Sequence, residues 1–339
     1  MSHHELRRTA RAMVAEGKGI LAADESTGTV TKRFETHGIE SNPENRRRYR
    51  EMLLLAPGGE RCVSGAILYG ETIRQSDSEG SPFAQVLAAR GILPGIKVDT
   101  GAKPLAGAPG ETVTEGLDGL RERLAEYHGL GARFAKWRAV ISIGDRRPGN
   151  ACVAANAHAL ARYAALCQEA EIVPIVEPEV LMDGDHSLER CAEVTERVLR
   201  AVFAALAEQQ VLLEGMVLKP NMVLAGAEHP EQASVEQVAA ATLRSLGRAV
   251  PAAVPGIAFL SGGQGAELAT AHLQAMAERG PHPWDLTFSY GRALQEDALA
   301  AWGGDEAHFV DGREAFLRRA RANGAARDGR WAADPEPVA

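Results

Sequence analysis

The sequence predicts a single (β/α)8 barrel, and two observations support this prediction. Short apolar runs bounded by glycine or proline recur along the chain, and eight of them have the composition of strands buried on both faces. Helical patterns separate most of these runs, and strands that alternate with helices pair in parallel. The eight runs lie at residues 19–23, 63–69, 95–98, 133–139, 172–176, 215–218, 256–260 and 285–289.

Eight strand–helix units favour a closed barrel over the alternative, an open doubly wound sheet. Such a sheet usually carries Gly-x-Gly-x-x-Gly after its first strand, and the sequence has no such motif there. A length of 339 residues fits one barrel domain. We expect this barrel, with extra N-terminal helices, over residues 1–323. A short C-terminal tail over residues 324–339 is polar, contains proline and is expected to be mobile.

The helical segments carry their own start signals. Asn42-Pro43 supplies an N-cap and a proline at the first helical position of one helix. Valines at helical spacing predict another helix over residues 188–208. Ser234 and Gln237 have the spacing of a capping box, which starts a helix over residues 235–250.

Composition excludes several classes of protein. A formal net charge of -8 argues against a general nucleic-acid binder but permits a local basic pocket for phosphate. No stretch approaches the ~20 apolar residues of a membrane span, and the N-terminus does not resemble a signal peptide. The cysteines are widely spaced, so we expect buried, reduced thiols in a cytoplasmic protein: Cys62, Cys152, Cys167 and Cys191.

Charged or hydroxyl residues stand at seven of the eight predicted strand ends. In a barrel the carboxyl ends of the strands carry the catalytic groups. Charges inside an apolar run cost too much free energy to be present without partners or a function. The strand-end residues are Asp24, Lys97, Lys136 with Arg138, Glu177 with Glu179, Lys219, Ser261, and Ser289 with Arg292.

Lys219 is the candidate nucleophile. It ends a short apolar strand, and Pro220 stops the pairing after it. Apolar surroundings and the positive charge of Lys136 favour the neutral amine, the form that attacks a ketone. Carboxylates at other strand ends supply the acid and base that imine chemistry needs. A lysine that extends from a strand end into solvent is the alternative interpretation of this segment.

Two glycine-containing loops predict a phosphate site. Residues 261–264 and 289–292 follow the seventh and eighth strands, where barrels often bind phosphate on backbone N–H groups and a helix start. Arg292 adds a guanidinium to this end of the barrel. The ten histidines are dispersed, so we expect no metal site, and a turn is the preferred interpretation of His186.

Seven motifs together resemble those of class I fructose-bisphosphate aldolases. The match runs in order from about residue 5 to residue 322. The motifs are GKGILAADESTG at 17–28, GIKVD at 95–99, FAKWR at 134–138, VPIVEPE at 173–179, VLKPNM at 217–222, FLSGGQ at 259–264 and TFSYGRA at 287–293.

The resemblance implies a barrel enzyme of glycolysis and gluconeogenesis that cleaves fructose 1,6-bisphosphate reversibly through a lysine Schiff base. Lys219 would form this imine at the C2 ketone, and Glu177 would be the acid and base for carbinolamine dehydration. Asp24 would take the proton of the C4 hydroxyl. Lys136 would balance charge around the carbinolamine, and Glu179 would orient Lys219 and Glu177.

The resemblance also implies the substrate contacts. Ser261, Gly262, Gly263, Ser289, Gly291 and Arg292 would hold the C1 phosphate. Arg33, Ser26, Thr29, Lys97 and Arg138 would serve the C6 phosphate. It further implies a cytoplasmic homotetramer that uses no cofactor and no metal, and whose ligands are sugar phosphates.

Two departures from the family pattern stand out. Thr29 replaces a serine, which keeps the hydroxyl group, so we expect little effect. The vertebrate enzymes carry a tail that ends in tyrosine, whereas this sequence has no tyrosine after Tyr290. We therefore expect slower protonation of the enamine, or the use of water or another acid. The preference between fructose 1,6-bisphosphate and fructose 1-phosphate stays open.

Three other functions stay open from the residues. Another imine-forming barrel, such as a transaldolase or a deoxyribose-phosphate aldolase, would share the lysine without a second phosphate subsite. A metal-dependent aldolase would be inhibited by a chelator. A retired enzyme that serves as a scaffold or sugar-phosphate sensor would bind the sugar without forming product.

Overall fold

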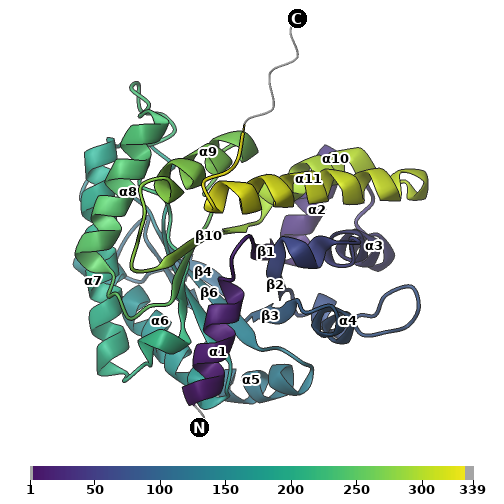
Figure 1. The fold of residues 1–339 in the computed structure, drawn as a ribbon. Coiled ribbons are helices and arrows are strands. Elements are labelled where there is room, and N and C mark those ends of the chain that lie inside the picture. The colour runs from purple at the N-terminus through teal and green to yellow at the C-terminus, as the bar shows by residue number, and fades with distance from the viewer. Residues whose placement is uncertain (1–2, 333–339) are drawn as a thin grey trace, which may run out of the picture.

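The computed structural model describes residues 3–332, and its centre is a closed barrel of eight parallel strands (Figure 1). Each of the eight predicted runs overlaps one of these strands, so the predicted barrel is confirmed and the open sheet is excluded. The strands follow one another around the barrel in the order β1 (Gly19–Ala23), β10 (Asp285–Tyr290), β9 (Gly256–Phe259), β8 (Val217–Leu218), β7 (Val173–Val180), β6 (Phe134–Ile141), β3 (Leu93–Lys97) and β2 (Val63–Leu68).

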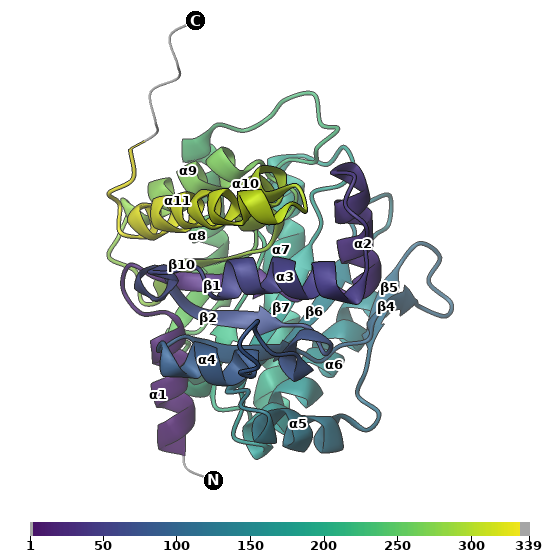
Figure 2. The ribbon, with the colours of Figure 1, turned by 90° about the vertical axis from the view of Figure 1, so that its right-hand side faces the viewer.

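Helices surround the barrel, and α10 and α11 lie side by side near β10 and β1 (Figure 2). Two helices, rather than one, separate β1 from β2, and a further helix precedes β1. The helices are α1 (His3–Met13), α2 (Thr27–Thr36), α3 (Pro43–Leu54), α4 (Phe83–Ala89), α5 (Leu120–Gly129), α6 (Asn150–Glu169), α7 (Leu188–Glu208), α8 (Val235–Ala249), α9 (Ala266–Ala277), α10 (Arg292–Trp302) and α11 (Phe309–Arg327).

The predicted helix starts are confirmed. The side chain of Asn42 accepts a hydrogen bond from the backbone N–H of Asn45 at 2.8 Å, so it caps α3. Ser234 and Gln237 form the reciprocal bonds of a capping box at α8. The helix predicted over residues 188–208 matches α7 in both bounds.

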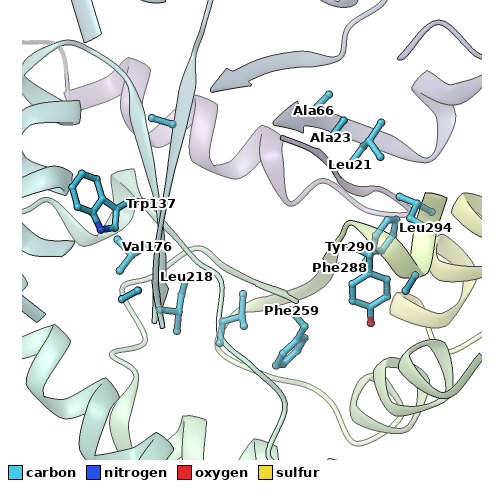
Figure 3. Close-up of a cluster of buried hydrophobic side chains, with 14 of the residues drawn as sticks. Leu21, Ala23, Ala66, Trp137, Val176, Leu218, Phe259, Phe288, Tyr290 and Leu294 are labelled. Carbon is cyan, nitrogen blue, oxygen red and sulfur yellow. The ribbon is translucent and has the colours of Figure 1, made fainter. Parts of the chain in front are cut away.

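Two apolar layers hold the barrel together. Inside it, Ile20, Phe134 and Val217 pack with Leu6 and Met13 of α1, which closes the amino-terminal end. Outside it, a second layer lies between the strands and the helices. Figure 3 shows part of this outer layer, including Trp137, Val176, Leu218 and Phe259.

Two features differ from the prediction. A hairpin of β4 (Gly101–Pro104) and β5 (Thr112–Glu115) lies between β3 and α5, in a stretch too short and too rich in glycine and proline to show alternation. Helix α11 also extends past the boundary predicted at residue 324, as far as Arg327. That guanidinium donates to the carbonyls of Val14 and Lys18, each at 3.0 Å.

Residues 333–339, the last part of the predicted tail, lie outside the described residues, and so does the expectation about enamine protonation that rests on them. All four cysteines are free and buried, as predicted. Within residues 3–332, no helix is both long and apolar enough to cross a membrane.

Candidate active site

Strand alternation places the charged residues directly above the apolar floor of the barrel. Side chains two residues apart in a strand share one face. In β6 the inward positions therefore pass from Phe134 to Lys136, and in β7 from Ile175 to Glu177. Lys219 follows Val217 in the same way at the end of β8. The barrel interior thus changes from apolar to ionic within one step along three neighbouring strands.

Four buried charged groups form the centre of the site. The Nζ atom of Lys136 lies 2.6 Å from Oδ2 of Asp24 and 3.4 Å from Oε2 of Glu177. The other carboxylate oxygen of Glu177, Oε1, lies 3.2 Å from Nζ of Lys219. All four residues are at most 8% exposed. Two carboxylates and two amines therefore alternate in one chain of contacts shielded from water.

These contacts set the ionisation of the site. Burial alone raises the pKa of Asp24, but the positive charges of Lys136 and Lys219 outweigh it and lower that pKa to about 2. For Glu177, burial likewise opposes ionisation, and the same two lysines still hold its pKa below the usual range. Burial opposes the charge of Lys136, yet Asp24 and Glu177 raise its pKa. Lys136 is therefore a fixed positive charge between two carboxylates.

A second set of ion pairs lies around this centre. Lys97 donates to Oδ1 of Asp99 at 2.5 Å. The guanidinium of Arg138 donates to Glu179. Glu179 thus pairs with Arg138 on the neighbouring strand, and its orientation of Lys219 and Glu177 stays a prediction.

The loop between β9 and α9, residues 261–265, has the backbone of an anion site. Gly262 and Gly263 adopt positive φ angles of 58° and 92°, which side chains rarely tolerate. Arg292, the first residue of α10, donates to the carbonyl of Gly263 at 2.9 Å. Within the described chain the buried hydroxyl of Ser289 has no hydrogen-bond partner. Since buried polar atoms are normally bonded, this hydroxyl is available to a ligand.

One cavity of about 750 Å³ unites the two ends of the site. Its volume lies in the usual range for pockets that bind small molecules. Every residue predicted for the site lines it: Asp24, Ser26, Thr29, Arg33, Lys97, Lys136, Arg138, Glu177, Glu179, Lys219, Ser261, Gly262, Gly263, Ser289, Gly291 and Arg292.

The sequence reasoning missed several residues that line the cavity, among them Glu25, Asp99 and Tyr69. Glu25 is a buried carboxylate between Arg33, at 2.5 Å, and Arg50, at 2.7 Å. Asp99 holds Lys97 and accepts the backbone N–H of Arg138 at 3.3 Å. Tyr69 also lines the cavity, two residues beyond Ile67 of the apolar floor. Glu25 and Asp99 stand next to predicted strand ends, which is the signal that would have found them.

In residues 3–332, no group of three or more histidine, cysteine, aspartate or glutamate side chains is arranged to hold a metal ion. The positively charged partners of the carboxylates at the centre of the site are lysines. The arrangement therefore suits imine chemistry on an amine.

Comparisons with known proteins agree with this geometry. A model of the family described as class I fructose-bisphosphate aldolase, glycolytic, matches residues 5–338. A protein of Xanthomonas campestris pv. campestris, named a probable class 1 fructose-bisphosphate aldolase, is 59% identical over 332 residues, which cover 98% of this chain and 99% of that protein. The cytosolic fructose-bisphosphate aldolase 4 of Arabidopsis thaliana is 51% identical over 98% of this chain and 85% of its own.

A solved structure is similar throughout. The fructose-bisphosphate aldolase of Plasmodium falciparum, in complex with TRAP and a small-molecule inhibitor, superposes with a TM-score of 0.96. It is 48% identical, and the match covers 98% of this chain and 96% of that one.

Proposed function

Because the chain belongs to the class I fructose-bisphosphate aldolase family, and is thus a metal-independent lyase, we propose that it cleaves fructose 1,6-bisphosphate reversibly through an imine on Lys219. The products are dihydroxyacetone phosphate and glyceraldehyde 3-phosphate. The observation that carries this assignment is the buried sequence of contacts from Lys219 through Glu177 and Lys136 to Asp24. It supplies a nucleophile, an acid–base group and a second base within one cavity.

Glu177 is the proposed acid and base of imine formation. Its Oε1 lies 3.2 Å from Nζ of Lys219, within reach of a proton transfer that leaves a neutral amine. The amine nitrogen attacks C2, and the proton that this nitrogen then loses passes to the former ketone oxygen, which becomes the carbinolamine hydroxyl. Glu177 then gives its proton to this hydroxyl, which leaves as water when the nitrogen lone pair forms the C=N bond. The protonated imine is the electron sink for the next step.

Asp24 is the proposed base of carbon–carbon cleavage. Its carboxylate takes the proton of the C4 hydroxyl, the C4–O bond becomes a carbonyl, and the C3–C4 bonding electrons move into the imine. Glyceraldehyde 3-phosphate leaves, and the enamine remains on Lys219. Protonation at C3 and hydrolysis of the imine then release dihydroxyacetone phosphate. Lys136 keeps Asp24 ionised for this step, since its ammonium lies 2.6 Å away.

The two phosphates are proposed to bind at opposite sides of the cavity. The loop at residues 261–265, with Ser289 and Arg292, supplies backbone N–H groups, a hydroxyl and a guanidinium for the C1 phosphate. Arg33, Lys97 and Arg138 supply positive charge for the C6 phosphate, together with the hydroxyls of Ser26 and Thr29. The cations are held by Glu25, Asp99 and Glu179, which fixes their positions before substrate arrives.

A cytoplasmic location and a homotetramer complete the proposal. The Arabidopsis relative is named cytosolic, which supports this location. Sedimentation equilibrium tests the tetramer, and a mass of one chain would contradict it.

Borohydride trapping tests the chemistry. The protein is incubated with dihydroxyacetone phosphate, reduced, digested and analysed by mass spectrometry. We expect the mass addition on Lys219 alone. Lys219→Arg keeps a positive charge beside Glu177 but cannot form the imine, so it should lose the adduct while staying folded, and Lys219→Ala provides a second control. No adduct on folded wild-type protein would contradict the imine mechanism, and binding of fructose 1,6-bisphosphate without product would indicate a sensor.

A further inference from the structure

A buried polar pair lies directly behind the loop proposed to bind the C1 phosphate. Gln264 belongs to the loop itself, and His272 stands two helical turns further on, in α9. These two residues are 4% and 1% exposed. The Nδ1 atom of His272 lies 2.6 Å from Oε1 of Gln264. The Nε2 atom of Gln264 donates to the carbonyl of Ser261 at 2.8 Å.

The chemistry of these groups fixes the direction of both bonds. The carbonyl of Ser261 only accepts, so the nitrogen of the Gln264 amide must face it and the oxygen must face His272. That oxygen also only accepts, so His272 carries its proton on Nδ1. Burial lowers the pKa of His272 to about 4, which keeps the ring neutral with a single N–H at pH 7. The chain of donation therefore runs from His272 through Gln264 to Ser261.

The loop depends on this support because its own residues restrain it weakly. Gly262 and Gly263 have no side chains to pack, and glycine backbones lose the most conformational entropy on ordering. Arg292 holds the carbonyl of Gly263 from the side of α10. From the interior, Gln264 holds Ser261 twice, since its backbone N–H donates to the same carbonyl at 3.0 Å. The loop is thus fixed at both ends of the diglycine.

Gln264 also connects the loop with the segment that carries the nucleophile. Its Nε2 lies 3.6 Å from Sδ of Met222, three residues after Lys219. The backbone N–H of Leu260 donates to the carbonyl of Pro220 at 3.1 Å. The loop at residues 261–265 is therefore held in register with the end of β8, where the proposed imine forms.

We propose that His272 and Gln264 are positioning residues that hold the loop at residues 261–265 in the conformation that receives the C1 phosphate. This inference rests on the proposed function, because it concerns the phosphate of the same substrate. Neither side chain lines the cavity, so both act through the backbone of Ser261, Gly262 and Gly263. We call the hydrogen bonds from His272 to Gln264 and from Gln264 to Ser261 the relay. Loss of the relay weakens binding of a phosphorylated ketone and does not change binding of a ketone without phosphate.

The test compares two ketones on four variants. Imine formation is followed by borohydride trapping at varied concentrations of dihydroxyacetone phosphate and of dihydroxyacetone. His272→Leu removes the donor, and we expect half-saturation by dihydroxyacetone phosphate to require about five- to tenfold more ligand, the usual effect of one hydrogen bond. Half-saturation by dihydroxyacetone should not change. His272→Asn keeps an N–H near the Nδ1 position and should restore the wild-type value.

Thr270→Val is the matched control. Thr270 lies on the same helix and is fully buried, but its hydroxyl bonds to Asn323, to Arg319 and to the carbonyl of Ala266 in its own helix, and to none of residues 261–265. This variant should lose stability without changing the response to either ketone. Gln264→Met, which has nearly the same volume, tests the relay independently should His272→Leu fail to fold.

The outcomes distinguish the positioning role of His272 and Gln264 from the proposed function of the protein. Equal weakening of both ketones by His272→Leu, or no weakening of either, would overturn the positioning role and leave the pair a structural element of the core. Failure of the wild-type protein to trap dihydroxyacetone phosphate would instead contradict the proposed function itself. Selective weakening that His272→Asn reverses supports the relay.

Discussion

Replacing Lys136 by methionine removes the positive charge that two buried carboxylates share. In the wild-type protein, Asp24 and Glu177 face the amines of Lys136 and Lys219. Lys136→Met keeps the volume of the side chain but leaves Asp24 with no close partner of opposite charge. Breaking a buried ion pair from one side typically costs about 3–5 kcal/mol, because the remaining charge stays away from water. We expect the free energy of unfolding of Lys136→Met to be lower than that of the wild-type protein by this amount at neutral pH.

The pKa of Asp24 gives an independent value for the free energy by which its ion pairs stabilise the fold. Its value of about 2 in the folded protein, against 3.8 for an ordinary aspartate, corresponds to about 2.5 kcal/mol of stabilisation. This stabilisation is fully present above pH 3.8 and is lost as the pH falls toward 2. In the variant, burial raises the pKa of Asp24, so its charge destabilises the fold at neutral pH and protonation removes that penalty. The stability difference between the two proteins should therefore be larger at pH 7.5 than at pH 4.5.

Urea unfolding followed by tryptophan fluorescence measures this difference, since Trp137 is the neighbour of Lys136 in β6. Lys103→Met, at an exposed lysine of the β4–β5 hairpin, is the matched control and should change little. The double variant Asp24→Asn with Lys136→Met should recover part of the lost stability. An equal loss at both pH values, or a double variant less stable than Lys136→Met alone, would refute the reasoning.

Three further predictions concern activity. Glu177→Gln should slow imine formation about 10²- to 10⁴-fold, measured by stopped-time trapping, and unchanged formation would remove Glu177 from the acid–base role. Arg33→Gln should raise the KM for fructose 1,6-bisphosphate about tenfold or more, but not the KM for fructose 1-phosphate. Glu25 keeps its ion pair with Arg50 in this variant. Equal effects on the KM values of both sugars would exclude a contact of Arg33 with the C6 phosphate. Excess EDTA should leave turnover unchanged, whereas inhibition that added metal reverses would point to a metal-dependent reaction.

The site residues on the strands could be predicted from the sequence because the alternation of side chains along a strand determines which way they face. Alternation in β7 puts Ile175 and Glu177 on the same face, so a charge that ends an apolar run must lie at the mouth of the barrel. The same rule applies to Lys136 and Lys219. Parallel pairing then brings these strand ends together without any knowledge of the loops.

The remainder depends on contacts between segments far apart in the chain, which no local pattern encodes. Glu25 is buried because Arg50 reaches it from α3, and neither residue shows this in its own segment. The end of α11 was predicted as a tail because its composition is polar. Arg327 is nevertheless largely buried, since it donates to carbonyls of the segment that leads into β1. The role of His272 likewise appears only when α9 packs behind the loop.

The division between strands and loops has an evolutionary consequence. Lys136, Glu177 and Lys219 stand on three adjacent strands, whose hydrogen-bonded register fixes their spacing. Part of the site proposed for phosphate stands instead on loops and helices, such as residues 261–265 and Arg292, whereas Lys97, Arg138 and Ser289 lie on strands. Exchange of a loop can therefore alter which sugar is accepted without disturbing the amine and its carboxylates. The barrel can therefore acquire new substrates by replacement of its loops, while the strand residues that break the bond stay the same.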